Sequence, residues 1–89
     1  MSLYKQDVQD LLKATKKYKN KEISLDDYKS AVWQAACAIV HVEEKDFRRF
    51  LQATEADLDT IQFTIDSNKI FDETLKIVRE IEARALQEL

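Results

Sequence analysis

The side chains best suited to nucleophilic or metal chemistry in this 89-residue sequence are one cysteine and one histidine. Cys37 precedes His41 by four residues, which places both on one side of a helix. A thiol and an imidazole can form a nucleophile–base pair, but no third group that would orient them can be assigned. Two such ligands are also too few for a structural zinc site. We therefore interpret Cys37 as a small core residue beside a histidine at a helix end, and expect no catalytic residue, metal site or cofactor.

Carboxylates are the most abundant reactive groups, with 17 Asp and Glu against 14 Lys and Arg, for a net charge of −3. General acid–base catalysis needs carboxylates whose environments separate their pKa values, and abundance alone does not provide this. The sequence contains no Gly and no Pro, which excludes glycine-rich phosphate loops and dinucleotide-binding turns. We expect a binding protein and not an enzyme.

The charges are unevenly distributed along the sequence. Residues 1–21 contain six lysines and two aspartates, whereas residues 50–68 contain four carboxylates and no Lys or Arg. A segment with only negative charge repels nucleic acid and attracts a basic protein surface, and such complementarity raises association rates. We predict a protein partner with a basic surface, such as the cleft of a nuclease, with a solvated face as the alternative. The four carboxylates of the segment are Glu55, Asp57, Asp59 and Asp66.

A homodimeric assembly or adaptor module is an alternative. The helix expected after residue 24 carries the small residues Ala31, Ala35 and Ala36, which form a thin face suited to close approach of a second copy. Trp33 is less clearly in phase with the apolar positions around it. We interpret Trp33 as a residue flanking the core, with an exposed anchor for a partner as the alternative.

Nucleic-acid binding would use the basic first helix. This helix contains no arginine and no interleaved exposed aromatic residue, and the whole sequence is acidic, unlike a typical DNA or RNA reader. We therefore interpret its lysines as a solvated face. The lysines in question are Lys13, Lys16, Lys17, Lys19 and Lys21.

The spacing of apolar residues predicts the helices that position these side chains. The first helix is expected over Leu3–Lys19, with Asn20 as its left-handed stop. The second is expected to begin after the N-cap Ser24 and to run to about His41.

The third helix is expected to enter through the acidic turn that precedes Phe47 and to reach Thr60. An extended connection is expected from Ile61, because apolar and polar residues alternate to Ile65, although a helix to Asp66 is an alternative. A turn or cap cluster over residues 66–68 then leads into the last helix, which is expected to run to about Gln87.

Four amphipathic helices joined by short loops predict an all-α domain over residues 1–89, an antiparallel four-helix bundle. No apolar run approaches the roughly 18–20 residues that a membrane span needs, and no signal peptide is recognised. A single cysteine allows no internal disulfide. We expect a cytoplasmic protein that is not inserted in a membrane.

Three groups of residues resemble a known family. They are Lys21-Glu22-Ile23-Ser24 with Asp27-Tyr28, then Phe50-Leu51 with Glu55-Ala56-Asp57, and last Phe63-Thr64-Ile65-Asp66-Ser67-Asn68, followed by Glu73 and Leu75-Lys76-Ile77-Val78. In this order they resemble the colicin D-type immunity proteins, small four-helix bundles that neutralise a tRNA-cleaving bacteriocin. Members of that family often carry Pro near the acidic turn, and this sequence has none.

The resemblance implies a site. In the immunity proteins, acidic residues after the third helix enter the active-site cleft of the toxin, where RNA phosphates would lie. By position, this role would fall to Glu55, Asp57 and Asp59, and less directly to Asp66.

Overall fold

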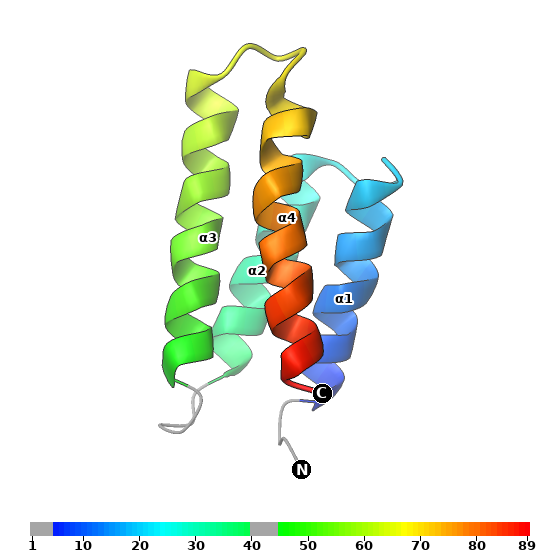
Figure 1. The fold of residues 1–89 in the computed structure, drawn as a ribbon, viewed down its shortest axis with the longest axis vertical. Helices are drawn as coiled ribbons and strands as arrows, with labels where there is room; N and C mark the ends of the chain where they lie inside the picture. Colours follow the sequence, from blue (N-terminus) through cyan, green and yellow to red (C-terminus); the bar gives the residue numbers. More distant parts are fainter. Residues whose placement is uncertain (1–4, 40–44) are drawn as a thin grey trace.

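The computed structural model describes residues 5–39 and 45–89. Within them the chain forms four helices: α1 (Lys5–Lys19), α2 (Leu25–Ala38), α3 (Lys45–Thr64) and α4 (Ile70–Gln87). Each helix packs against its neighbours in the sequence, and α1 packs against α4, which closes an antiparallel four-helix bundle (Figure 1). The predicted fold class is confirmed. None of the helices in the described part of the chain combines the length and apolar character needed to cross a membrane.

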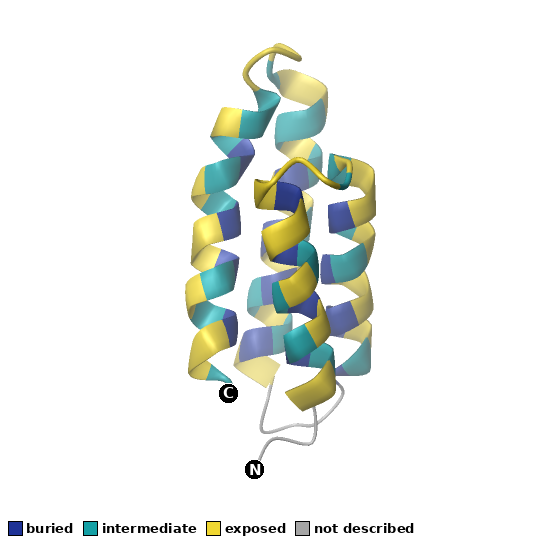
Figure 2. Cartoon of the chain, turned by 90° about the vertical axis from the view of Figure 1, so that its right-hand side faces the viewer, coloured by how far each residue is buried: buried dark blue, intermediate teal, exposed yellow. Residues whose placement is uncertain are grey.

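The core is one cluster that takes side chains from all four helices, and the buried positions face the bundle axis (Figure 2). In α1 the buried residues recur every three or four positions, as predicted from the sequence, and the predicted start of the helix at Leu3 lies outside the described residues. The buried residues of α1 are Val8, Leu11, Thr15 and Tyr18. The tightest part of α2 is Tyr28 and Val32, which have no exposed surface.

The prediction that Asn20 is the left-handed residue at the end of α1 is wrong, because Lys21 takes this conformation with φ of 62°. The Lys21 N–H donates to the carbonyl of Tyr18 at 2.9 Å, and the Glu22 N–H donates to the carbonyl of Lys17 at 2.8 Å. These two bonds form a Schellman motif, in which the left-handed residue stands just beyond the helix cap.

The start of α2 is confirmed and its end is not. The Ser24 hydroxyl accepts a hydrogen bond from the Asp27 N–H at 3.1 Å, so Ser24 is the N-cap. The helix ends at Ala38 instead of about His41, because Ile39 leaves the helical conformation (φ −89°, ψ 89°) and buries its side chain in the core. His41 itself lies outside the described residues.

The helix α3 runs to Thr64, so the predicted extended connection from Ile61 is wrong and the longer alternative is closer. Thr60 and Thr64 donate their hydroxyl hydrogens to carbonyls four residues earlier, at 3.0 and 2.7 Å, which suits these residues to a helix. The alternation of apolar and polar residues over residues 61–65 does not mark a half-buried strand, because the apolar Phe63 at its centre is 77% exposed.

Residues 66–69 form a turn, and α4 has no side-chain cap at its N-terminus. The Lys69 N–H closes this turn on the Asp66 carbonyl at 2.8 Å. The helix α4 then ends at Gln87, as predicted. At 1.5 Å per residue, α3 is about 30 Å long and α2 about 21 Å. The loop between α3 and α4 therefore projects beyond the turn between α1 and α2 (Figure 1).

Candidate functional site

The predicted partner-binding carboxylates do not share one face of α3. Glu55 and Asp59 are four residues apart and lie on the flank next to α2, where Glu55 lines a pocket with α2 residues and Asp59 contacts Lys29. Asp57 is two residues from each, which is a rotation of about 200° around the helix axis. Asp57 therefore lies on the other flank of α3.

The other flank of α3 faces α4. Phe50 marks it, because its ring lies 4.7 Å from the guanidinium of Arg84 on α4. Asp57 follows Phe50 by seven residues, or two helical turns, and is exposed on that side. Asp66 is exposed in the projecting loop. The structure thus brings Glu55 and Asp59 together and places Asp57 and Asp66 apart from them.

Asp59 holds α2 against α3. The Lys29 ammonium donates to Asp59 at 2.7 Å and to the side-chain oxygen of Gln62 at 2.5 Å, and it lies 3.7 Å from Asp26. Gln62 donates in turn to Asp26 at 2.9 Å. The hydrogen bond that Lys29 donates to Asp59 raises the pKa of Lys29, and the charges of Asp59 and Asp26 act in the same direction. The negative charge of Asp59 is therefore already balanced within the chain.

The other three predicted site carboxylates have no positively charged partner in the described residues. Glu55, Asp57 and Asp66 form no ion pair with any residue in the described ranges. Three of the four predicted site residues thus have a charge available to a partner.

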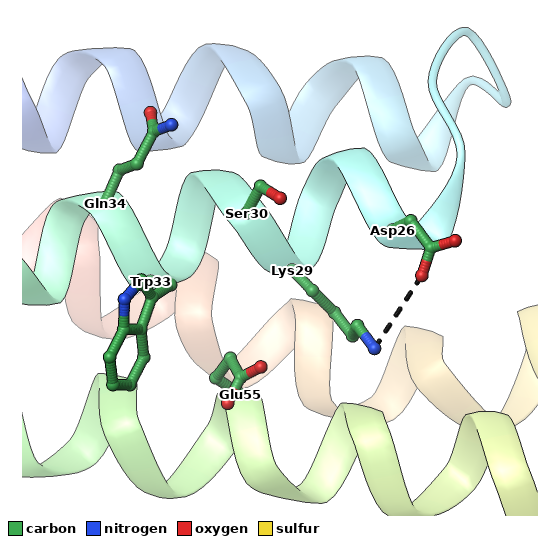
Figure 3. A pocket seen from close by; sticks show the side chains of 6 residues that line it. All are labelled: Asp26, Lys29, Ser30, Trp33, Gln34 and Glu55. Atoms are coloured by element: carbon green, nitrogen blue, oxygen red, sulfur yellow. Dashed lines mark ion pairs between the residues drawn. The ribbon is translucent and has the colours of Figure 1, made fainter.

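A pocket of about 330 Å³ lies between α2 and α3, and we call it the Trp33 pocket. Its lining residues are Asp26, Lys29, Ser30, Trp33, Gln34 and Glu55. Figure 3 shows that the Trp33 side chain descends from α2 towards α3, while the Glu55 side chain rises from α3 towards α2 beside it. Lys29 lies further along the same groove and points to Asp26.

Sequence reasoning missed this pocket because it misjudged the outer side of α2. Trp33 is 50% exposed, so the interpretation of Trp33 as a residue flanking the core is wrong. Cys37, expected in the core, is exposed as well and follows Trp33 by one helical turn. The core side of α2 includes Ala35 and Ala36, which are buried. Most of the thin alanine face invoked for dimerisation is thus covered by the chain itself.

Two lysines of α1, Lys13 and Lys16, line a second, larger hollow of about 470 Å³ with Gln9 and Leu12. Lys13 and Lys16 contribute two positive charges to it and no aromatic residue is present. Lys19 is engaged elsewhere, in an ion pair with Glu82 of α4 at 3.1 Å. This hollow lacks the stacking groups that single-stranded nucleic-acid sites use.

The described residues contain no group of three or more His, Cys, Asp or Glu side chains placed to hold a metal ion. Comparisons with protein-family models, with curated proteins and with solved structures find no match to this chain. The function must therefore be argued from the geometry and charge of the site.

Proposed function

We propose that this chain is a non-catalytic binding protein that neutralises a nuclease toxin by occluding its basic active-site cleft. The observation that carries the proposal is the unbalanced negative charge of Glu55, Asp57 and Asp66, in a segment of 19 residues without Lys or Arg. A cleft that binds RNA or DNA is lined by positive charges that contact phosphates. Carboxylates from this chain would occupy the places of those phosphates.

The arrangement of the carboxylates suits a cleft better than a flat surface. Glu55 lies on the α2 flank of α3, Asp57 on the α4 flank, and Asp66 at the projecting end of the hairpin. Charges on two flanks and a tip would meet basic groups on both walls and at the base of a cleft. The resemblance to the colicin D-type immunity proteins supports the same mode of inhibition and, among these residues, Glu55 and Asp57 first.

The proposal is tested by capture and inhibition. The tagged chain is incubated with lysate of its native source, the bound proteins are identified by mass spectrometry, and their cleavage of tRNA and DNA is assayed with and without the chain. We expect a basic nuclease whose activity is abolished by an equimolar amount of the chain. Recovery of only the chain itself, or of a partner whose activity the chain leaves intact, would contradict the proposal.

The site is tested with two variants of equal charge. Glu55→Gln/Asp57→Asn/Asp66→Asn removes the three carboxylates without an ion pair from α3 and its loop, and Asp7→Asn/Asp10→Asn/Glu80→Gln removes three from α1 and α4. We expect the first variant to lose inhibition and the second to keep it. Urea unfolding of both variants is measured in parallel to show that both are folded. Equal loss of inhibition by the two folded variants would mean that net charge alone is recognised, and full inhibition by both would remove these carboxylates from the site.

A further inference from the structure

The Trp33 pocket combines two groups that bind the same kind of ligand. The indole of Trp33 is half exposed and provides an aromatic face, and the carboxylate of Glu55 stands beside it from the facing helix (Figure 3). An aromatic face attracts a cation through its quadrupole, and Trp is the strongest of the aromatic side chains in this respect. A carboxylate next to the ring adds a charged hydrogen-bond acceptor.

The electrostatics of the pocket favour a cation even though Lys29 lines it. Lys29 supplies one positive charge, and the carboxylates of Asp26, Asp59 and Glu55 around it supply three negative charges. The Lys29 ammonium is held by Asp59 and Gln62, and its side chain is only 14% exposed. The Lys29 ammonium thus remains bound to Asp59 and Gln62, and Glu55 forms no ion pair in the described residues.

We propose that the Trp33 pocket receives an arginine side chain of the protein partner. This inference rests on the proposed function, because it assigns one basic group of the partner to one place on the chain. A planar guanidinium stacks on an indole and donates two parallel hydrogen bonds to a carboxylate, whereas a lysine ammonium does neither. A volume of about 330 Å³ is at the lower end of the range of ligand pockets, which fits a single long side chain.

The test uses peptide probes, so it does not depend on the partner. The probes are acetyl-Ala-Ala-Arg-Ala-Ala-amide and the same peptide with citrulline, which keeps the shape of arginine and lacks its charge. Trp33 is the only tryptophan of the chain, so its fluorescence and its indole N–H signal in ¹⁵N NMR report on the pocket alone. We expect saturable binding of the arginine peptide and at least about tenfold weaker binding of the citrulline peptide, because a charge-assisted hydrogen bond is lost.

Two variants assign the binding to the pocket. Glu55→Gln should weaken the binding of the arginine peptide by about tenfold. Asp72→Asn removes the same charge from α4, away from the residues that line the pocket, and should change the affinity by less than about twofold, since exposed charges are screened by solvent and salt. Neither residue forms an ion pair in the described structure, so both variants are expected to fold, which is checked by thermal unfolding.

The assignment of an arginine site would be overturned by the absence of a saturable Trp33 response or by equal affinity for the two peptides. It would also be overturned if the two variants bound the arginine peptide equally weakly. Failure here together with capture of an inhibited nuclease would leave the proposed function standing and remove only the arginine site. Peptide binding without any captured nuclease would support the arginine site and contradict the nuclease as partner.

Discussion

At the scale of single residues, the core contains two hydrogen bonds between tyrosine and threonine hydroxyls. Tyr28 lies 2.9 Å from Thr15, and Tyr18 lies 2.7 Å from Thr74. Each threonine already donates its only hydroxyl hydrogen to a backbone carbonyl, that of Leu11 or of Phe71. Each tyrosine must therefore be the donor and each threonine the acceptor. These bonds link α1 to α2 and α1 to α4 in the interior of the bundle.

This direction predicts unequal effects of removing the two partners. Thr15→Val leaves the buried hydroxyl of Tyr28 without an acceptor and should lower the free energy of unfolding by about 1–3 kcal/mol. Tyr28→Phe leaves Thr15 bonded to Leu11 and should cost only about 0.5–1.5 kcal/mol. The double variant should cost less than the sum of the two. Urea unfolding of all three measures these values, and strictly additive effects would mean that the hydroxyls do not interact.

The buried tyrosines also predict a loss of stability in alkali. Burial raises the pKa of both Tyr18 and Tyr28 above the ordinary value of 10.0. The folded state thus favours the protonated phenols, and this stabilisation is complete below pH 10 and is lost as the pH rises towards the folded pKa. The urea midpoint should fall above pH 10.

The control for this pH dependence is Tyr28→Phe, which removes the more buried of the two tyrosines in the described residues. The free energy of unfolding of this variant should decline less steeply above pH 10 than that of the native chain. The two slopes should differ by up to about 1.4 kcal/mol per pH unit. Identical slopes for the variant and the native chain would place the alkaline transition on other groups, of which Lys29 is the first to consider, since its pKa is raised too.

At the scale of the elements, helix starts and core faces could be predicted because their causes are local. Ser24 caps α2 through a bond to a residue three positions away, and the apolar positions of α1 recur within one turn. The end of α3 depended on contacts across the bundle. The alternation around Phe63 resembles a strand, but Phe63 lies against the ammonium of Lys29, 5.7 Å from its ring centre, and Gln62 bonds to the same group.

The candidate site was predictable in charge and not in geometry. The absence of Lys and Arg over residues 50–68 identified the acidic segment. It could not show that Asp59 is paired with Lys29, 30 residues earlier in the chain, while Glu55 is unpaired. Nor could it place Trp33 beside Glu55, because that neighbourhood depends on how α2 and α3 pack and on the rotation of each helix.

The pairing of Asp59 predicts a difference between neighbouring carboxylates. Asp59→Asn removes the main partner of Lys29 and should lower the free energy of unfolding by about 0.5–1 kcal/mol, a modest value because Asp59 is half exposed. Asp57→Asn should change it by less than about 0.5 kcal/mol, as is usual for surface positions. Guanidinium chloride would screen the pair, so urea unfolding at low salt is the measurement. Equal stabilities would mean that the Lys29 pair contributes nothing.

The left-handed turn at the end of α1 predicts that glycine is more stable than alanine at position 21. Lys21 occupies the left-handed region, which costs a residue with a Cβ roughly 1 kcal/mol relative to glycine. Its ammonium also lies 4.8 Å from the ring centre of Phe71, so Gly and Ala at this position must be compared with each other. The free energy of unfolding of Lys21→Gly should exceed that of Lys21→Ala by about 1 kcal/mol, so the Gly variant should unfold at a higher urea concentration. An Ala variant of equal stability would contradict the strain assigned to this turn.

At the scale of the whole molecule, charge and shape coincide. The helices α3 and α4 are the longest, and their connecting loop forms the projecting end of the bundle (Figure 1). That end carries the unpaired Asp66, with Asp57 about two turns below it on α3. Five lysines lie on α1, which does not contact α3 in the described part of the chain, and Lys69 lies at the α4 end of the loop. The negative charge of the projecting end is therefore carried on its α3 side, by Asp57 and Asp66.

This polarity predicts how the rate of association depends on salt. Asp57→Asn/Asp66→Asn removes two exposed charges from the negative end, and Asp7→Asn/Asp10→Asn removes two from α1, so the net charge changes equally. With the captured nuclease in stopped-flow mixing, the first variant should associate at least about threefold more slowly than the second at 20 mM salt, because steering depends on where the charge lies. The difference should vanish near 1 M salt, where the screening length is about 3 Å. Equal slowing by the two variants at low salt would mean that net charge alone guides the encounter and that the projecting end does not lead it.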